Sequence, residues 1–367
     1  MTVLRVSMFH TLPAEARMSS EVYAGELAKA LRVAGVQVFD VWPPTESPTR
    51  QSFGMAAARR YSDRYIHYQA QAVRSSSQIN HIPDHGYGHL AFSLNPQRTV
   101  VTFLDAMLLK LRAHEFLSQR APWFTLAGHL IGLRAIRRVA RVITPSSSSR
   151  DDFLRFQDYP PERVVTIPLA VSSSFRPFPG RQNDSTRAPS ILHVGHCGFY
   201  KNVESILRAL PLVQQRLGRP VRFRKVGGRF TSAQEELIAS LGIGNSIDHL
   251  GTLTDEELAR AYTDADVLLM PSLHEGFGLP VLEAMASGTP VLASNRGSLP
   301  EVVRDAGVLV EPEDLDAIAD AVVLLLTDPI LRDELVRRGL ERAREFTWER
   351  TARATLDVYR AVCAEAT

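Results

Sequence analysis

The sequence predicts an α/β fold of two Rossmann-like, doubly wound domains. Short apolar runs typical of buried parallel strands alternate with helical segments, as in the strand–loop–helix–strand unit from Val267 to Ser294. The length of 367 residues is enough for two domains that each bury a core. Residues 173–189 are rich in Pro, Ser, Arg and Gly and lack periodicity, so we interpret them as the interdomain linker.

This interpretation gives an N-terminal domain at residues 1–172 and a C-terminal domain at 190–346. In the first domain we expect strands at residues 2–9, 36–41, 79–83, 99–103, 142–144 and 164–167. In the second we expect strands at residues 190–194, 221–226, 267–270 and 291–294, followed by amphipathic helices from 315 to 366.

The composition is that of a soluble globular protein, with 22% charged and 45% hydrophobic residues. The only cysteines are Cys197 and Cys363, which argues against a disulfide framework or a thiolate metal site and fits a reducing cytosol. No signal peptide is evident, and no apolar run is long enough to cross a bilayer. We therefore expect a cytoplasmic protein that could reach the inner face of the membrane.

The charge is distributed unevenly along the chain. Residues 1–180 carry a net charge of +8, whereas residues 181–367 carry −6. A basic N-terminal half suits an anionic acceptor or peripheral contact with a membrane surface. Nucleic acid is an alternative partner, which a strong salt-dependent shift with RNA would reveal, but we do not favour it.

The most informative stretch follows the strand at 267–270. Two carboxylates, Glu275 and Glu283, have seven residues between them and flank the start of a helix expected from Leu279 to Ser287. Gly276 and Gly278 allow the backbone to approach a ligand, and the free N–H groups of a helix's first turn can bind an anion. An anion cradle with a carboxylate on each side suits a nucleotide sugar.

Two further loops of this domain have similar features. Glycines and then Lys201 follow the strand at 190–194 and precede a helix, which suits phosphate binding. Residues 297–301 again place a glycine before a helix N-terminus. We expect both loops to lie at the same edge of the sheet as Glu275.

The run H-E-G-F-G-L-P-x-L-E-A-M-A-x-G-x-P-V from His274 closely resembles the E-x7-E signature of retaining glycosyltransferases of family 4, the glycosyl transferases group 1. The resemblance implies the GT-B architecture, in which the two domains face each other across a cleft, with a final helix at residues 347–367 that crosses back to the N-terminal domain. It places Glu275 near the donor sugar, Glu283 at the ribose hydroxyls and Lys201 at the diphosphate. The donor-binding residues that we expect are His196, Lys201, Gly276, Phe277, Gly278, Leu279, Glu283, Ser298 and Glu301.

The N-terminal domain departs from the pattern of the resembled family. Arg17-Met18-Ser19-Ser20 stands where relatives usually carry glycines, and Leu104 stands where a histidine usually faces the donor sugar. In the C-terminal domain, His196 stands where an arginine is usual. Either Asp105, beside Leu104, or a histidine of the preceding loop would then replace the missing histidine, unless the geometry differs; we take Asp105 as a second catalytic candidate after Glu275. Further residues that we expect to line the cleft are His85, His274 and Ser146.

The expected activity is transfer of a hexosyl group from a nucleoside-diphosphate sugar to a hydroxyl acceptor, with retention of anomeric configuration. The acceptor could be a carbohydrate, a lipid-linked glycan or a small molecule. We expect no cofactor and no metal, because no Asp-x-Asp pair lies where a metal-bridged diphosphate would need one. The alternatives are a GT-B phosphorylase, a nucleotide-sugar epimerase and a catalytically silent nucleotide-sugar-binding protein.

Two segments of the N-terminal domain allow more than one interpretation. His81, His85 and His89 raise the hypothesis of a metal site, but Gly86 and Gly88 argue against a helix that would align the last two, so we expect a polar turn at 84–89. Residues 121–142 are expected to form a basic helix with an apolar face. Such a helix can lie on an anionic membrane, but we favour a core helix with a solvated arginine face.

Overall fold

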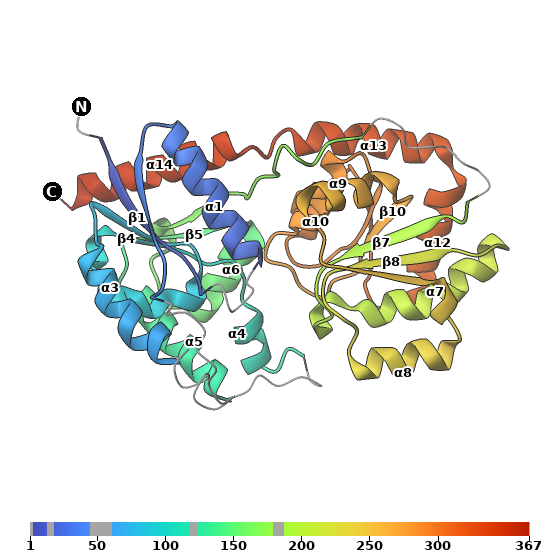
Figure 1. The fold of residues 1–367 in the computed structure, drawn as a ribbon, viewed down its shortest axis with the longest axis horizontal. Helices are drawn as coiled ribbons and strands as arrows, with labels where there is room; N and C mark the ends of the chain where they lie inside the picture. The colour runs from blue at the N-terminus through green and yellow to red at the C-terminus, as the bar shows by residue number, and fades with distance from the viewer. Residues whose placement is uncertain (1–2, 13–17, 45–60, 117–122, 179–186, 367) are drawn as a thin grey trace. The chain divides into compact units, whose positions relative to one another are not determined.

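The computed structural model describes residues 3–12, 18–44, 61–116, 123–178 and 187–366. It divides the chain into two compact units (Figure 1): unit 1 is Met1–Leu169 with Trp348–Thr367, and unit 2 is Ala170–Thr347. Arg17 and residues 179–186 of the expected linker lie outside the described residues.

Unit 1 contains a six-stranded parallel sheet in the order β2-β1-β3-β4-β5-β6. Its strands are β1 (Arg5–Phe9), β2 (Gln37–Val41), β3 (Ile79–Ile82), β4 (Thr99–Thr102), β5 (Arg141–Thr144) and β6 (Val164–Thr166). Its α-helices are α1 (Met18–Val33), α3 (Tyr68–Arg74), α4 (Met107–Arg112), α5 (Trp123–Ile136), α6 (Ser147–Phe156) and α14 (Trp348–Glu365). The shorter helices are η2 (Asp63–His67), η3 (His85–Phe92), η4 (Pro96–Arg98) and η5 (Pro161–Arg163).

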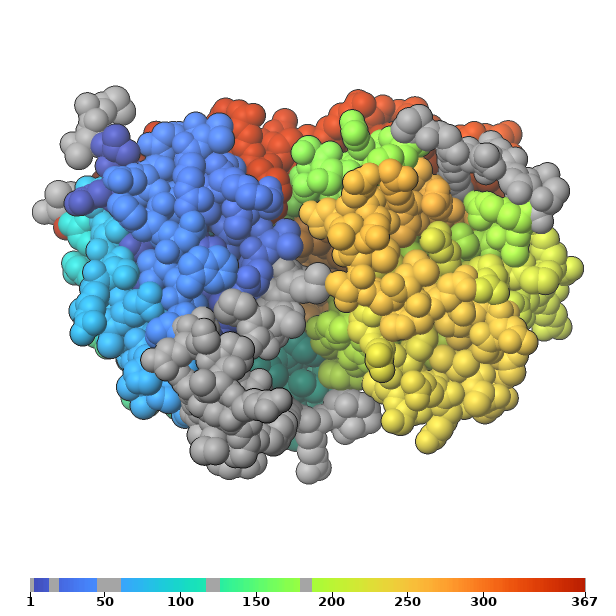
Figure 2. Space-filling model, in the orientation of Figure 1, coloured from blue at the N-terminus to red at the C-terminus, as the bar shows by residue number. Residues whose placement is uncertain are grey.

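The last helix of the chain, α14, packs on α1 in unit 1 (Figure 1). The Tyr359 hydroxyl is hydrogen bonded to Nδ1 of the buried His81 at 2.6 Å, and the Thr351 hydroxyl donates to the Pro168 carbonyl at 2.9 Å. The opposite side of α1 lies at the surface of unit 1, where it is drawn in blue in Figure 2. Unit 1 is therefore built from both ends of the chain.

Unit 2 contains a second six-stranded parallel sheet, in the order β12-β11-β10-β7-β8-β9. Its strands are β7 (Ser190–Val194), β8 (Arg222–Val226), β9 (Ile247–Gly251), β10 (Val267–Met270), β11 (Val291–Ser294) and β12 (Val308–Val310). Its α-helices are α7 (Val203–Leu217), α8 (Ser232–Leu241), α9 (Asp255–Asp264), α10 (Leu279–Ala286), α11 (Leu299–Val303), α12 (Leu315–Thr327) and α13 (Pro329–Ala343). The 3₁₀ helices are η6 (Phe199–Lys201) and η7 (Gly244–Ser246).

The local sequence explains these elements well. The central strands are mostly apolar and wholly buried, as expected for parallel strands that helices cover on both sides. Thr231 and Thr254 form capping boxes that satisfy the first N–H groups of α8 and α9. The expected strands of both units are confirmed to within a few residues, so the prediction of an α/β fold with two Rossmann-like sheets was correct.

The structure differs from the sequence-based expectations in three places. Residues 85–92 form the 3₁₀ helix η3 rather than a turn, because the Asp84 carboxylate accepts a hydrogen bond from Gly86 N–H and burial of the segment outweighs the low helix propensity of glycine. The helix expected at 121–142 ends at Ile136, and Ala140 N–H already pairs with the Thr99 carbonyl of β4. The strands β9 and β12, at the two edges of the second sheet, were not expected.

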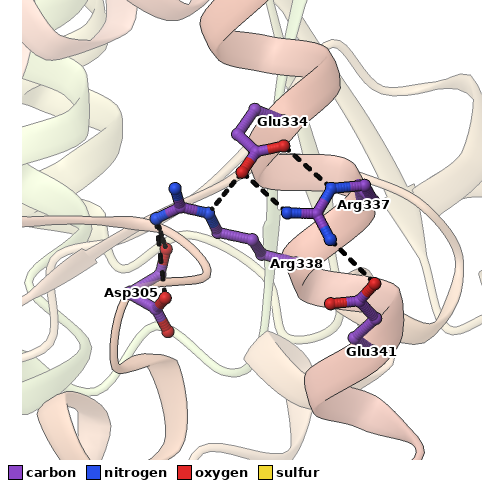
Figure 3. Close-up of polar contacts among 5 residues, drawn as sticks. All are labelled: Asp305, Glu334, Arg337, Arg338 and Glu341. Atoms are coloured by element: carbon purple, nitrogen blue, oxygen red, sulfur yellow. Dashed lines mark hydrogen bonds and ion pairs between the residues drawn. The ribbon is translucent and has the colours of Figure 1, made fainter.

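The outer helix α13 carries a network of exposed ion pairs (Figure 3). Glu334 pairs with Arg337 and Arg338 one turn along the helix, and Arg337 also pairs with Glu341. Arg338 reaches Asp305, which lies just after α11. Exposed pairs of this kind contribute only a few tenths of a kcal/mol each, so they support the helix rather than any site.

Candidate active site

The loops after β7 and β10 meet where the strand order of unit 2 reverses. The two strands are neighbours, and the chain continues from β7 to β8 on one side and from β10 to β11 on the other. In open α/β sheets ligands bind at such a switch point, outside the carboxyl ends of the strands. The loop after β7 carries Lys201, and the loop after β10 carries Glu275. The topology therefore places the candidate site of unit 2 at these two residues.

Lys201 and Glu275 form a buried ion pair at this switch point. Lys201 Nζ lies 2.7 Å from Glu275 Oε1, and each residue is only 8% exposed. Removing one member of such a pair would leave a buried charge without its partner. The pair holds a cation and a carboxylate side by side, which can meet a phosphate with one and sugar hydroxyls with the other.

Asn202 fixes the position of Lys201. It adopts a left-handed conformation, with φ of 53°, between η6 and α7. Its side-chain amide donates to the carbonyls of Pro271 at 3.0 Å and Pro312 at 2.7 Å. Asn202 therefore connects the loop after β7, which carries Lys201, to the loop after β10, which carries Glu275, and to the segment after β12. Sequence analysis did not single it out, although its place directly after Lys201 was a local signal.

Ser298 and Gly297 hold the backbone of Glu275. The Ser298 hydroxyl donates to the Glu275 carbonyl at 3.0 Å, and Ser298 N–H donates to the same oxygen at 3.3 Å. Gly297 has φ of +63°, and a Cβ there would lie 3.0 Å from both the amide nitrogen and the carbonyl oxygen of Glu275. The side chain of Ser298 thus faces the backbone of Glu275 and positions the loop that carries this residue.

The backbone of residues 277–279 is built as an anion cradle. Gly278 starts α10 with φ of +99°, and a Cβ there would meet Leu299 at 2.6 Å. Pro280 in the first turn of α10 has no N–H group to satisfy. Among the residues that the structure describes, the N–H groups of Phe277, Gly278 and Leu279 donate no hydrogen bond. They are therefore available to an anionic ligand.

The other predicted residues near this cradle have different surroundings. The buried Phe277 packs edge-on against Phe346, with 5.8 Å between ring centroids, so its side chain faces the protein interior. His274 is 4% exposed and packs beside Gly297. The carbonyl of Glu301, in α11, accepts a hydrogen bond from Arg342 at 2.8 Å. Gly276 and Leu279 are half-buried.

Glu283 lies on α10 and is hydrogen bonded to Tyr262 of α9. The Tyr262 hydroxyl donates to Glu283 Oε2 at 2.8 Å. Burial raises the pKa of Glu283 to about 7, although the bond from Tyr262 acts in the opposite direction. A carboxyl with this pKa changes its charge near neutral pH. Tyr262 was not predicted, because it lies 21 residues before Glu283 and in another helix.

His196 braces the turn that follows β7. Its Nδ1 accepts a hydrogen bond from Gly198 N–H at 2.8 Å, and its Nε2 is hydrogen bonded to the Tyr200 hydroxyl at 2.6 Å. The Tyr200 carbonyl in turn accepts from Leu273 N–H of the loop after β10 at 2.8 Å. The exposed His196 ring thus shapes the loop that carries Lys201.

In unit 1 the structure brings together three of the predicted residues at the carboxyl ends of β3, β4 and β5. His85 Nδ1 accepts from Leu104 N–H at 3.2 Å, and the Leu104 carbonyl accepts from the Ser149 hydroxyl at 3.0 Å. Ser146 caps α6 by accepting from Ser149 N–H, and Asp105 accepts from Met107 N–H at 2.9 Å at the start of α4. These bonds give Ser146 and Asp105 structural roles at the sheet edge.

The three histidines of unit 1 do not converge on one point. His81 is hydrogen bonded to Thr102 and Tyr359, and its burial lowers its pKa to about 3. His89 Nε2 donates to the Arg64 carbonyl at 2.9 Å, whereas His85 packs against Phe103 and His129. Within the described ranges, no group of three or more His, Cys, Asp or Glu side chains could hold a metal ion.

The two Rossmann-like units define the class of the protein as a GT-B fold. A family model described as glycosyl transferases group 1 matches residues 177–342, and one described as glycosyltransferase family 4 matches residues 20–175. The chain therefore belongs to this glycosyltransferase family, as the resemblance of the run from His274 suggested. A solved sucrose-phosphate synthase from Thermosynechococcus elongatus has the same fold, with a TM-score of 0.80 and 21% identity over 99% of this chain and 100% of that one.

Two curated relatives are more similar in sequence. The O-antigen chain mannosyltransferase B of Escherichia coli is 35% identical over 228 residues, which span 60% of this chain and 60% of the relative. The MMP alpha-(1->4)-mannosyltransferase of Mycolicibacterium hassiacum is 37% identical over 232 residues, which span 62% of this chain and 55% of the relative. The matched segments thus cover little more than half the length of each relative.

Proposed function

We propose that the protein is a retaining glycosyltransferase that moves a hexosyl group from a nucleoside-diphosphate sugar to a hydroxyl acceptor in glycan or glycoconjugate biosynthesis. The observation that carries this proposal is the Lys201–Glu275 pair at the topological switch point of unit 2. The unpaired N–H groups of residues 277–279 supply further donors to a diphosphate beside it. We place the reaction in the cytoplasm, at the inner face of the membrane.

The chemistry explains why these groups would be needed. Breaking the bond between the anomeric carbon and the diphosphate oxygen develops negative charge on the diphosphate and oxocarbenium character on the sugar. Lys201 and the start of α10 would stabilise the first as preorganised donors, and Glu275 would hold hydroxyls of the sugar. Glu283 would accept hydrogen bonds from the ribose hydroxyls. Cationic and backbone donors replace a metal in this scheme, so we propose a metal-independent reaction.

Retention of configuration would follow a front-face route. The acceptor oxygen bonds to the anomeric carbon on the side that the diphosphate leaves, and the acceptor proton passes to the leaving phosphate oxygen. A double-displacement route instead needs a nucleophile on the opposite face of the sugar ring. In this proposal Glu275 pairs with Lys201 and binds the donor, so we do not assign it the role of that nucleophile.

The first donor to test is a nucleoside-diphosphate mannose. Both curated relatives described above are named as mannosyltransferases, and each is more than 30% identical over its matched segment. The acceptor is proposed to be a carbohydrate, a lipid-linked glycan or a small molecule with a free hydroxyl. The sugar could also be another hexose, so the screen must extend to UDP-, GDP- and ADP-sugars.

The experiment that tests the proposal is a transfer assay on the full chain. Thermal shift with UDP-, GDP- and ADP-sugars should single out one donor, because a ligand that binds the folded state raises the melting temperature. NMR of the glycoside formed from this donor should show the same anomeric configuration as the donor. The rate should be unchanged when EDTA removes divalent metals.

Other outcomes of this assay would contradict the proposal in defined ways. An inverted product would exclude the front-face route, and loss of activity in EDTA would exclude metal independence. Conversion of the donor without any acceptor would indicate an epimerase, and sugar transfer to inorganic phosphate would indicate a phosphorylase. Donor binding with no turnover on a broad acceptor panel would indicate a silent binding protein.

We also propose that unit 1 binds an anionic membrane surface. A cavity of about 920 Å³ is lined by apolar side chains, which include Leu109, Leu130 and Leu133, and by four arginines (Arg112, Arg134, Arg137 and Arg138). The guanidinium groups of Arg112, Arg134 and Arg138 make no hydrogen bond or ion pair to any residue that the structure describes. Acidic phospholipids carry the matching charge and apolar chains. No described helix is long and apolar enough to span a bilayer, so this contact would be peripheral.

Replacing Arg134, Arg137 and Arg138 together by glutamine should weaken binding to phosphatidylglycerol vesicles by about 100-fold, since each basic residue near such a surface contributes about 1 kcal/mol. Cosedimentation at low salt measures the effect. A matched control replaces three exposed arginines that have carboxylate partners, Arg260, Arg337 and Arg353. Equal loss in both variants, or equal binding to phosphatidylcholine, would argue against a specific surface.

A further inference from the structure

Lys225 is a wholly buried cation beneath the candidate donor site. It lies near the end of β8, is 0% exposed and pairs in register with the equally buried His193 of β7. Only four of the 42 Lys and Arg residues are lysine (Lys29, Lys110, Lys201 and Lys225). Two of these four lysines belong to the candidate site region: Lys201 follows β7, and Lys225 lies near the end of β8. A compact ammonium group fits a confined site that a guanidinium group would not.

The ammonium group of Lys225 donates hydrogen bonds to backbone carbonyls at the end of β8 and in the turns after β7 and β8, and it also interacts with the Cys197 thiol. It donates to Gly195 at 2.5 Å, in the turn after β7, and to Gly228 at 3.2 Å, in the turn after β8. A third bond of 2.9 Å goes to Val226. The Cys197 thiol also donates to the Gly228 carbonyl, at 3.4 Å. Lys225 therefore joins the two turns from beneath.

The two turns touch each other backbone to backbone. Gly227 has φ of +99°, and a Cβ there would lie 2.4 Å from the Gly195 carbonyl oxygen. A Cβ on Gly228 would lie 3.3 Å from His196 Cα. Contact this close requires glycine on one side and a fixed carbonyl on the other. Lys225 supplies the group that fixes the Gly195 carbonyl.

The turn after β7 directs its carbonyls inward. Lys225 holds the Gly195 carbonyl, and the side chain of the buried Gln234 donates to the Cys197 carbonyl at 3.3 Å. The N–H and C=O groups of a trans peptide point in opposite directions. The N–H group of His196 therefore points away from Lys225, whereas the N–H group of Gly198 is already bonded to His196 Nδ1 within the turn.

No carboxylate balances the charge of Lys225 within the described part of the chain. Its partners are the three carbonyls and the Cys197 thiol, whose pKa is raised by burial, and Lys201 is a second cation nearby. Burial lowers the pKa of the Lys225 ammonium. A buried cation without an anionic partner is costly, so a chain that retains one at a proposed phosphate site gains from an anion that binds there.

We propose that Lys225 is a positioning residue for the diphosphate of the donor. It holds the turns at 195–198 and 227–228 together so that they receive the diphosphate, and the diphosphate provides the negative charge that the free protein lacks. This inference rests on the proposed function of the unit 2 site. Lys201 is expected to contact the diphosphate directly. Lys225 would be a second cation, which acts through the two turns that it holds.

The test compares the binding of inorganic pyrophosphate with that of a nucleoside, both measured by calorimetry on the full chain. Replacing Lys225 by methionine should weaken pyrophosphate binding by about tenfold or more, because one cation near the anion is lost. Binding of the matching nucleoside, taken from the nucleoside diphosphate that binds best among UDP, GDP and ADP, should stay within about twofold. Equal weakening of both ligands would show that Lys225 merely supports the fold, and unchanged pyrophosphate binding would exclude any role.

A second variant separates charge from hydrogen bonding and guards against misfolding. Lys225→Gln keeps two N–H donors for the carbonyls but removes the charge. It should fold as the wild type does in circular dichroism and still lose pyrophosphate affinity; full affinity in this variant would overturn the proposed role of the charge. Lys29→Met, at an exposed position in α1, is the matched control.

Lys201→Met separates this inference from the proposed function itself. If Lys201→Met weakens pyrophosphate binding but neither Lys225 variant does, the donor site stands and the inference fails. If wild-type protein binds neither pyrophosphate nor any of the three nucleoside diphosphates, both fail.

Discussion

Replacing Glu275 by glutamine is expected to lower the turnover number of sugar transfer on the order of a thousandfold, the scale seen when a preorganised electrostatic contact in an active site is removed. Glutamine has nearly the same shape, so the bonds from Ser298 to the backbone of residue 275 can persist. The substitution removes only the negative charge that faces Lys201 and, in our proposal, the donor sugar. Steady-state kinetics with the donor identified by thermal shift measure the effect.

The expected loss has to be separated from loss of stability. Glu275→Gln leaves Lys201 buried without its partner, and breaking such a pair costs about 3–5 kcal/mol. The double variant Glu275→Gln with Lys201→Met removes both charges and should recover part of the lost stability while remaining inactive. Ser298→Ala, which keeps both charges, should reduce turnover much less. Turnover of Glu275→Gln within a few-fold of wild type would refute the assignment of this carboxylate.

Replacing Glu283 by glutamine is expected to weaken donor binding by about tenfold at pH 8 and to abolish its pH dependence. The pKa of Glu283 is about 7 in the free protein, so the carboxyl is mostly ionised at pH 8 and mostly protonated at pH 6. Only the ionised form can accept hydrogen bonds with both oxygens from the ribose hydroxyls. Donor affinity of the wild type should therefore fall as the pH is lowered through 7, and the two proteins should converge near pH 6.

The same substitution should have the opposite effect on stability. The pKa of Glu283 is raised above its value of 4.5 in an unfolded chain, so the folded protein favours the protonated form. Its ionisation then lowers stability progressively as pH rises from about 4.5 to about 7, by an amount on the order of 3 kcal/mol. Glu283→Gln removes this cost and should raise the melting temperature at pH 8 by several degrees. Calorimetry beside the exposed control Glu313→Gln measures it, and a lower melting temperature would argue against a strained carboxylate.

The sequence was sufficient to predict the first sheet, the four central strands of the second, and the loops that carry Lys201 and Glu275. Buried parallel strands give continuous apolar runs, and glycines mark the turns between strand and helix. The sequence was less informative about the hydrogen-bond partners of the site residues. Tyr262 and Asn202 act on groups that lie 21 to 110 residues away in the chain, and no local pattern records such distances. Lys225 resembles an ordinary polar residue in a strand until the register places it opposite His193.

The mistaken expectations also have physical causes. Gly86 and Gly88 disfavour a helix in isolation, but a capping Asp84 and nearly complete burial of residues 85–91 outweigh that preference. The helix from Trp123 was extended too far because its basic and apolar pattern continues into residues that pair with β4. A strand of three residues, such as β12, is too short to produce a periodic signal.

The return of α14 to unit 1 implies an order of events during synthesis on the ribosome. Unit 2 occupies one continuous stretch of the chain, so all of its strands are synthesised before the last helix. Unit 1 cannot be completed until residues 348–367 are synthesised, because they supply Tyr359, one of the hydrogen-bond partners of the buried His81. Of the two units, the one whose synthesis begins first is thus the one completed last, and until then its α1 helix and the buried end of β3 lack their packing partner α14.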